Sequence, residues 1–468
     1  MTHFLSLTVS WSVLVIEVLT VLVWSTLGAE ATQAGATPTS PEATKLAQER
    51  QLNGVLVPGF DGAVIWTGAE IVISDGMHSL AMNPEKNTWR RLAANPAAKG
   101  VAQPKLLVFG DGKVLAVYWS GEHDLELPVV KGVTYPQWPA GTKVRLCFDL
   151  YDTKADAWRR LAALDRADFK DSRGEPIEDF TWTPEADIKV TSFPLSIVGL
   201  VPVPGGAVVF IFPNSAYGTN MGFQVLESGR VSRISQKDAP PHGARDVAVY
   251  SRGAQVLYYF YAMVDHNEWA VWDQGTDTWS KSQSIGRRYS FGSCSSGDEV
   301  YIFGGAESSA FGWIKRDGAI YSFKDNKWRD MPMENGPHGR RDFTMCWTGK
   351  EVLVWGGQTL GEVAPGREVG AANAPWNAVF AFSPTEGKWR VLTGKDAPPA
   401  RAYSQSVWTG KEMIIVGGQA PWPGGYTLLD KGIYAFDPNE CRWRRLPDLP
   451  VEEAATRPPK AAPVAPPK

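Results

Sequence analysis

Short apolar runs joined by tight turns recur along this chain and predict a repeated β-hairpin. The two clearest copies occupy residues 406–418 (SVWTGKEMIIVGG) and 345–357 (MCWTGKEVLVWGG), and further copies lie at residues 64–76 and 294–305. In each copy, two apolar runs flank a turn that contains glycine, and the second run is rich in the β-branched and aromatic side chains that favour strands. A third segment and then a Trp follow downstream, so the pattern predicts a unit of four short strands.

Two independent markers count these units. The first marker is the turn glycine, which occurs at Gly68, Gly112, Gly206, Gly253, Gly297, Gly349 and Gly410. The second is a Trp near the end of each unit, at Trp89, Trp158, Trp279, Trp328, Trp389 and Trp443, with Val231 in its place in the third unit. A period near 50 residues built from short strands is typical of a β-propeller. The sequence therefore predicts an all-β fold of seven four-stranded blades, with six blades as the alternative.

The last three units resemble kelch repeats. They carry the double glycine that ends the second strand of a kelch unit, the aromatic residue of the third strand and the Trp of the fourth. The first two of these signatures are Gly304-Gly305, Gly356-Gly357, Gly417-Gly418, Tyr321, Phe380 and Tyr434. The resemblance extends over roughly residues 55–450, although the first four units lack the glycine pair. It implies a kelch-type β-propeller of six or seven blades, similar to the propeller of galactose oxidase.

The two ends of the chain differ in composition from the repeats. Residues 4–27 form a long apolar run, and Ala29-Glu30-Ala31 after it has the small-x-small pattern of a signal-peptidase site. We interpret residues 1–31 as an export signal, with an uncleaved N-terminal anchor as the alternative, although Glu17 disfavours a permanent span. We therefore expect an extracytoplasmic protein, secreted or periplasmic, with a membrane contact only through an uncleaved segment.

The remaining boundaries follow from proline and small polar residues. Residues 32–50 are predicted to be a flexible linker, residues 51–450 the propeller, and residues 451–468 a disordered tail rich in Pro, Ala and Lys. The formal net charge of −3 and the lack of a basic run disfavour nucleic acid as a partner.

Four scattered cysteines show neither metal-ligand spacing nor the density of a disulfide framework. They are Cys147, Cys294, Cys346 and Cys441. Cys294 and Cys346 occupy the same place in successive units, three residues before the turn glycine. We predict that both are buried thiols, and a disulfide between them is the alternative.

The long insertions are predicted to share one face of the disc. We name the strands of a unit A to D in chain order; in the last unit, A spans residues 403–408 and B spans residues 413–416. In an up-and-down meander, the B to C loops and the D to A connections lie opposite the A to B and C to D turns. The long pieces all belong to the first group: residues 121–145, 306–318, 358–377, 419–432 and 164–190. Loops on a rigid scaffold commonly carry function, whereas two of these, 121–145 and 164–190, have bracing of the second blade as their alternative role.

Arginines begin several A strands and should surround the channel mouth on that same face. Guanidinium groups suit a carboxylate or another anion, and the kelch resemblance implies such a site, since arginines at this place bind acidic peptides in some kelch domains. The alternative is that each pairs with an Asp such as Asp246 or Asp342, or with a backbone carbonyl in the next blade. Loop aromatics can stack on sugars or anchor a protein, or simply pack the loops. The predicted ligand-binding residues are Arg245, Arg288, Arg340, Arg341, Arg401, Trp138, Trp313, Trp376, Trp422 and Tyr426.

The sequence supplies little chemistry. The histidines lack metal-binding spacing. The two Tyr, two His and Cys that form the copper centre of galactose oxidase have no match in this chain. We therefore expect no metal and no cofactor, and we assign no catalytic residue. The preferred hypothesis is an exported, non-catalytic binding module for a protein or glycan ligand. An anionic ligand would suit the arginines. One alternative is a carbohydrate-active enzyme of oxidase, epimerase or lyase type that uses loop acids, and another is a structural envelope component. These acids are Glu122, Asp124, Glu307 and Glu362.

Overall fold

The computed structural model describes residues 63–450 with gaps, chiefly 75–78, 122–137, 170–189, 214–220, 263–267, 308–313 and 359–376. The described residues all belong to one compact unit, Leu56–Glu126 with Pro136–Pro450. The predicted export signal (1–31), linker (32–50) and tail (451–468) lie outside the described residues. Among the residues described, no helix is long and apolar enough to cross a membrane.

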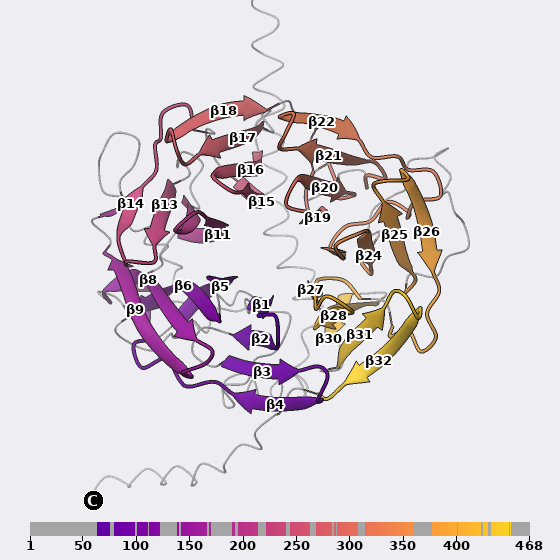
Figure 1. The fold of residues 1–468 in the computed structure, drawn as a ribbon, viewed down its shortest axis with the longest axis horizontal. Coiled ribbons are helices and arrows are strands. Elements are labelled where there is room, and N and C mark those ends of the chain that lie inside the picture. The colour runs from indigo at the N-terminus through magenta and orange to yellow at the C-terminus, as the bar shows by residue number, and fades with distance from the viewer. Residues whose placement is uncertain are drawn as a thin grey trace, which may run out of the picture. The chain divides into compact units, whose positions relative to one another are not determined.

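Seven four-stranded antiparallel sheets follow one another around a ring (Figure 1), which confirms the predicted all-β propeller with seven blades. Blade 1 contains β1 (Ala63–Trp66), β2 (Ile71–Ser74), β3 (Ser79–Asn83) and β4 (Thr88–Arg91). Blade 2 contains β5 (Val101–Val108), β6 (Lys113–Gly121), β8 (Val144–Asp152) and β9 (Ala157–Leu164). Blade 3 contains β11 (Leu195–Val203), β12 (Gly206–Pro213), β13 (Met221–Leu226) and β14 (Val231–Arg233).

The second half of the ring repeats this order. Blade 4 contains β15 (Ala244–Arg252), β16 (Gln255–Ala262), β17 (Glu268–Asp273) and β18 (Thr278–Ser282). Blade 5 contains β19 (Gly292–Ser295), β20 (Glu299–Phe303), β21 (Gly318–Ser322) and β22 (Lys327–Asp330). Blade 6 contains β23 (Thr344–Trp347), β24 (Val352–Trp355), β25 (Val379–Ser383) and β26 (Lys388–Leu392). Blade 7 contains β27 (Gln405–Trp408), β28 (Met413–Val416), β31 (Ile433–Asp437) and β32 (Arg442–Leu446).

Both faces of the B strands are apolar because each blade packs between two neighbours. In β2, Ile71 and Ile73 join the cluster shared with blade 7, while Val72 between them joins the cluster shared with blade 2. Successive side chains of a strand point to opposite faces, so a continuous apolar run serves two seams at once. Apolar clusters of this kind fill every seam of the ring, including the seam between the last and first blades.

In blades 1, 2, 4 and 6, the Trp of the fourth strand donates a hydrogen bond across a seam to the preceding blade. The indole Nε1 of Trp158 donates to the carbonyl of Ala93 at 2.6 Å, and that of Trp389 donates to the carbonyl of Pro332 at 2.7 Å. Trp89 makes the same bond around the closure of the ring, to the carbonyl of Pro447 at 3.1 Å. The residue that marks the repeat in the sequence therefore joins neighbouring blades as well as filling the seam.

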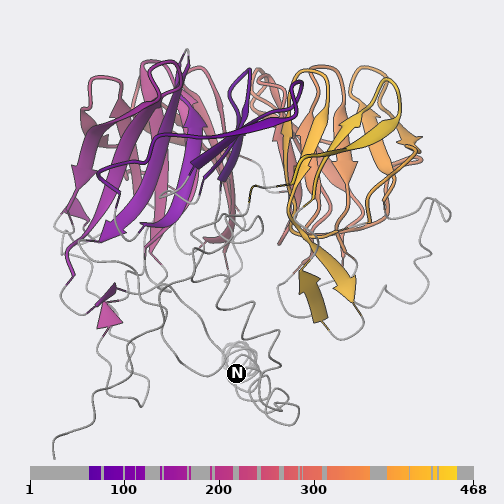
Figure 2. The same cartoon turned by 90° about the horizontal axis from the view of Figure 1, so that it is seen from below.

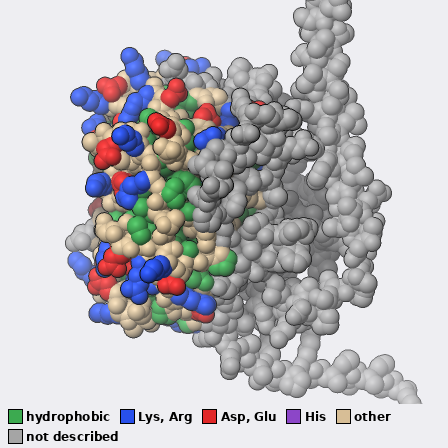
Figure 3. Space-filling model, turned by 90° about the vertical axis from the view of Figure 1, so that its right-hand side faces the viewer, with side chains coloured by type: hydrophobic (Ala, Val, Ile, Leu, Met, Phe, Trp, Pro, Cys, Tyr) green, Lys and Arg blue, Asp and Glu red, His purple; other side chains and the backbone are tan. Residues whose placement is uncertain are grey.

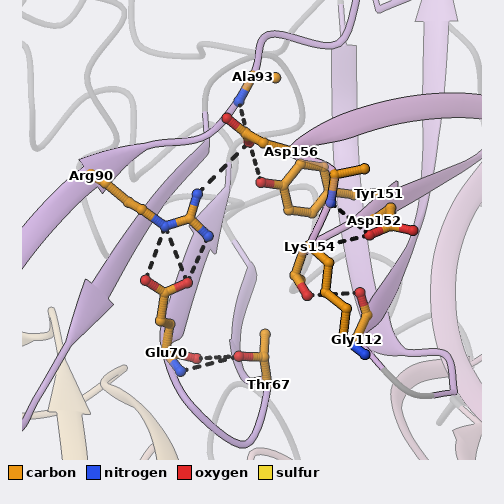
Figure 4. Close-up of polar contacts among 11 residues, drawn as sticks. Thr67, Glu70, Arg90, Ala93, Gly112, Tyr151, Asp152, Lys154 and Asp156 are labelled. Carbon is orange, nitrogen blue, oxygen red and sulfur yellow. Dashed lines mark hydrogen bonds and ion pairs between the residues drawn. The ribbon is translucent and has the colours of Figure 1, made fainter.

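The same four-stranded unit carries a repeated ion pair at its outer edge. A Glu after the A to B turn accepts hydrogen bonds from the Arg that follows the fourth-strand Trp. Figure 4 shows the pair in blade 1, where Arg90 donates to Glu70 at 2.9 and 2.7 Å and Asp156 of blade 2 lies 3.8 Å from the Arg90 guanidinium. The equivalent pairs are Glu299 with Arg329, Glu351 with Arg390, and Glu412 with Arg444.

Closure of the ring depends on side chains. Within the described residues, each blade takes its four strands from one continuous stretch of chain, so no strand is exchanged between the first and last blades. Arg444 of blade 7 instead reaches blade 1, where it donates to Asn87 Oδ1 at 3.1 Å and to the carbonyl of Pro84 at 3.0 Å.

The two halves of the ring differ in strand length. The A strands β5, β11 and β15 have 8, 9 and 9 residues and are each irregular in register near their first residues. The A strands β19, β23 and β27 have 4 residues each. Blades 5 to 7 therefore begin their inner strands with a bend where blades 2 to 4 continue an extended strand, and strand A of blade 7 begins two residues later than predicted.

The four cysteines are free thiols, and Cys294 and Cys346 are buried, as predicted. Burial raises the pKa of the Cys346 thiol to about 12. Both thiols lie in inner strands, where they fill apolar seams.

Replacement of Trp389 by Ala tests the role of the seam tryptophans. The side chain is 5% exposed, so its loss should lower the free energy of unfolding by about 3 to 5 kcal/mol, measured by urea denaturation. Val391→Ala on the same strand is the control, because Val391 is 39% exposed and its truncation should change little. Equal effects of the two variants would contradict the seam role.

Ring closure is tested by comparing Arg444→Ala with Arg390→Ala. Each variant loses an equivalent Glu pair, but only Arg444 also donates two hydrogen bonds to blade 1. We expect Arg444→Ala to lower the free energy of unfolding by about 1 to 3 kcal/mol more than Arg390→Ala does. The same loss in both variants would show that the cross-seam bonds add nothing to closure.

Candidate functional site

The candidate site lies on the face where the B strands end. In blade 7, Gln405 at the start of β27 pairs with Val416 at the end of β28, so the inner strand begins on the side where the B to C loop leaves. Two small accessory sheets, β7 (Trp138–Pro139) with β10 (Val190–Thr191) and β29 (Gln419–Trp422) with β30 (Gly425–Leu428), lie on one common face of the ring (Figure 2). We call this the loop face.

Three of the predicted arginines are buried beneath the loop face. Arg288, Arg340 and Arg401 are each 1% exposed. Each donates from Nη1 to the carbonyl of a glycine 16 residues later: Gly304 at 2.9 Å, Gly356 at 2.9 Å and Gly417 at 3.2 Å. The expectation of three open guanidinium groups at the channel mouth is corrected accordingly, and the backbone-carbonyl alternative applies, with the carbonyl in the same blade rather than the next. Short inner strands allow this, because the bend before each strand turns the Arg side chain under the glycine pair.

Aromatic rings and one carboxylate complete the arginine environment. The Arg340 guanidinium lies 5.2 Å from the ring centre of Phe380, and that of Arg401 lies 5.0 Å from the ring centre of Tyr434. These rings are the third-strand aromatics of the kelch signature. Burial lowers the pKa of Arg340 to about 9. Arg288 instead donates from Nη2 to Asp317 Oδ2 at 2.6 Å.

The glycine pair is required because the next blade approaches it closely. Gly356 has φ of 73°, and a Cβ atom there would lie 2.5 Å from the carbonyl oxygen of Arg401. The amide of the neighbouring Gly357 donates to that same oxygen at 2.9 Å, and Gly305 donates to the carbonyl of Arg340 at 2.8 Å. Each Arg thus donates within its own blade through its side chain and accepts from the preceding blade through its backbone.

Two residues after each buried Arg, the backbone turns into the left-handed region. The residues are Ser290, Asp342 and Tyr403, with φ of 52°, 56° and 60°. The amide of Asp342 donates to the carbonyl of Ser290 at 3.0 Å, and that of Tyr403 donates to the carbonyl of Asp342 at 2.8 Å. Left-handed backbone is strained for a residue as bulky as Tyr and is held here by bonds between blades.

Four polar side chains meet above these bonds, and we call them the mouth cluster: Arg341, Asp342, Gln358 and Tyr403. Gln358 Nε2 donates to Asp342 Oδ2 at 2.6 Å and to Tyr403 Oη at 3.0 Å. Arg341 Nε lies 3.5 Å from Asp342 Oδ2. Gln358 is 3% exposed, whereas Tyr403 is 42% exposed. The cluster therefore presents one aromatic ring to solvent and holds it with buried polar groups.

Sequence reasoning identified Arg341 but assigned no ligand role to Asp342, Gln358 or Tyr403. A usable signal was present, because the residue two places after each Arg and the residue after each glycine pair have fixed positions in blades 5 to 7. The position two places after the Arg has no recurring residue type, so a search for repeated motifs passes over it. Gln358 and Gln419 both follow a glycine pair, and that repeat was the usable signal.

The structure places four of the other predicted contacts by their backbone alone, and two lie outside the described residues. Arg245 lies in β15, Trp138 in β7, Trp422 in β29 and Tyr426 in β30. The strands of Trp422 and Tyr426 form one hairpin, which follows Gly417-Gly418 at the loop face. Trp313 and Trp376 lie outside the described residues.

Loop acids supply no assembled catalytic group in the part of the chain that the structure describes. Glu307 pairs with Lys315 at 3.6 Å, and its side chain is 49% exposed. Glu122, Asp124 and Glu362 lie outside the described residues. Among the described residues, no group of three or more His, Cys, Asp or Glu is placed to hold a metal ion.

On the side shown in Figure 3, the outer wall of the ring carries no large patch of one charge sign. Lys and Arg side chains alternate there with Asp and Glu. The outer strands carry ion pairs such as that of Arg390 with Glu351.

Comparisons with known proteins agree with this geometry. Residues 264–460 match the family model described as the KLHDC2/KLHL20/DRC7 Kelch-repeats domain. Two curated relatives, both named N-acetylneuraminate epimerase, come from Haemophilus influenzae strains 86-028NP and PittEE. Each is 24% identical over 183 residues, which make up 34% of this chain and 48% of the relative. The chain thus spans about half the length of the curated relatives it matches.

Arg340→Ala and Arg341→Ala test the division between buried and exposed arginines. Loss of Arg340 leaves the carbonyls of Gly356 and His338 without this donor, so we expect the free energy of unfolding to fall by about 2 to 4 kcal/mol. Arg341→Ala should cost less than about 1 kcal/mol, because its ion pair is long and partly exposed. Urea denaturation measures both, and similar losses would contradict the assignment.

Proposed function

This chain is a kelch-repeat β-propeller, and from that premise we propose that it is a non-catalytic binding module for a protein or glycan ligand. The ligand would occupy the loop face. Propellers of this kind hold their loops on a rigid ring, which is the arrangement that favours recognition.

The observation that carries the proposal is the mouth cluster. Asp342, Gln358 and Tyr403 are joined by hydrogen bonds of 2.6 and 3.0 Å, and the backbone amides of Asp342 and Tyr403 bond to the preceding blade. Polar groups held in place before binding lose little conformational entropy when a ligand arrives. A rigid polar cluster around an exposed ring is therefore well suited to selective binding.

An anionic group on the ligand is expected to meet Arg341. Its side chain is 18% exposed, and its Nε has no hydrogen-bond partner among the described residues, although it lies near Asp342. We propose that Trp138, Trp422 and Tyr426 add contacts from the accessory sheets. Arg245, Trp313 and Trp376 remain proposed contacts of the same face.

We also propose that the protein works outside the cytoplasm. The support is the apolar run of residues 4–27 with the small-x-small pattern after it. N-terminal sequencing of the purified protein would locate the mature start.

A second candidate function is a carbohydrate-active enzyme of epimerase type. The name shared by the two relatives favours it, and Asp342 would be the carboxylate of the mouth cluster nearest a bound sugar. Incubation with N-acetylneuraminate, followed by NMR of its epimers, distinguishes the two functions. Faster interconversion than in buffer, lost in Asp342→Asn, would establish the enzyme and overturn the non-catalytic module.

The binding proposal predicts a loss of affinity in Arg341→Ala. Arrays of acidic and neutral glycans, together with synthetic acidic peptides, provide the probes. We expect the acidic ligands to bind at least tenfold more weakly, because the variant lacks the guanidinium that would donate charged hydrogen bonds to them. Arg252→Ala is the control, since Arg252 pairs with Asp298 beside the A to B turns on the other face. Unchanged binding in Arg341→Ala would remove this residue from the site.

A further inference from the structure

Tyr403 combines three properties that packing alone does not explain. Its φ of 60° lies in the region that Gly, Asn and Asp tolerate and that a bulky side chain rarely adopts. The residue is 42% exposed, so it gains little from burial. The positions equivalent to it in blades 5 and 6 hold the smaller Ser290 and Asp342, for which the conformation is less costly. A large aromatic residue is therefore kept where a small one would be more stable.

Two contacts fix the orientation of Tyr403. The backbone amide donates to the carbonyl of Asp342 at 2.8 Å, and the phenol oxygen accepts from Gln358 Nε2 at 3.0 Å. Gln358 is itself held by Asp342 Oδ2 at 2.6 Å. The ring is thus held at both ends, with strain in its backbone and part of its surface in solvent. Strain of this kind, held by its surroundings, is a feature of binding sites.

We propose that Tyr403 is the ligand-contact residue of the mouth cluster and that its ring receives the apolar face of a pyranose. This inference rests on the proposed binding function of the loop face and names the ligand class. A sugar ring presents C–H groups on one face and hydroxyls at its edge. Tyr403 matches the face, and the partly exposed guanidinium of Arg341 matches hydroxyls at the edge. The side chains of Gln358 and Asp342 are buried and hold the phenol in place.

The exposed surface of the described residues favours a sugar over a protein partner. The exposed large apolar side chains there are Val108, Val391 and Tyr403. Val108 ends β5 of blade 2 and Val391 lies in the outer strand β26, so neither extends the apolar surface around Tyr403. A protein interface usually has an apolar core of several side chains. One ring surrounded by polar groups is instead the size of a single sugar residue.

Tyr403→Asn separates recognition from stability. Asn tolerates left-handed backbone, so the variant should melt about 1 to 3 °C higher than the wild type while binding of pyranosides falls at least tenfold. The probes are N-acetylneuraminate and methyl β-galactopyranoside, measured by saturation-transfer NMR and calorimetry. Asp396→Asn is the matched control, because Asp396 also has φ of 60° but lies exposed outside the cluster. It should leave binding unchanged.

Each adverse outcome overturns a different statement. A lower melting temperature in Tyr403→Asn would overturn the strain argument, and pyranoside binding equal to that of the wild type would remove Tyr403 from the site. Binding of acidic peptides but of no pyranoside would overturn the sugar assignment and leave the binding module intact. Binding of neither class by the wild type would overturn the proposed function itself. Tyr403→Phe, which keeps the ring, should retain most of the affinity.

Discussion

The hydrogen bond from a buried arginine to a glycine carbonyl is the interaction on which blades 5 to 7 depend. Within blade 6, Arg340 donates to the carbonyl of Gly356. The amide of Gly357 then donates to the backbone oxygen of Arg401 in blade 7, which joins the two blades. A buried guanidinium is costly unless its donors are used. Its use here explains why the glycine pair and the arginine recur together at a fixed separation.

The candidate site is a consequence of this chain of bonds. The bend that turns each arginine inward also places Ser290, Asp342 and Tyr403 in left-handed backbone at the channel mouth. The amides of Asp342 and Tyr403 then bond to the preceding blade, and side chains gather above them. Blades 2 to 4, whose inner strands run on with an irregular register, do not form this bend in the described residues. The structural arginines and the exposed tyrosine are thus two products of one local geometry.

Much of the fold could be predicted from the sequence, because the determinants of the fold repeat. The turn glycines and closing tryptophans such as Trp389 counted seven blades, and Cys294 and Cys346 were correctly placed as buried thiols. The site was harder to predict. Arg340 and Arg341 are adjacent in sequence and alike in type, yet one is buried and the other half-buried, since strand position alone does not show which way a bend turns. Tyr403 carries no repeated signature, because the residue at its position differs in each of blades 5 to 7.

Hydrogen exchange of individual amides tests the central claim most directly. The amides of Gly305, Gly357, Asp342 and Tyr403 donate between blades at the channel mouth. If the arginine and glycine bonds hold these blades together, these four amides exchange as slowly as the strand amides of β20 and β24. Exchange as fast as in the exposed A to B turns would contradict the account, because the mouth would then open independently of the ring.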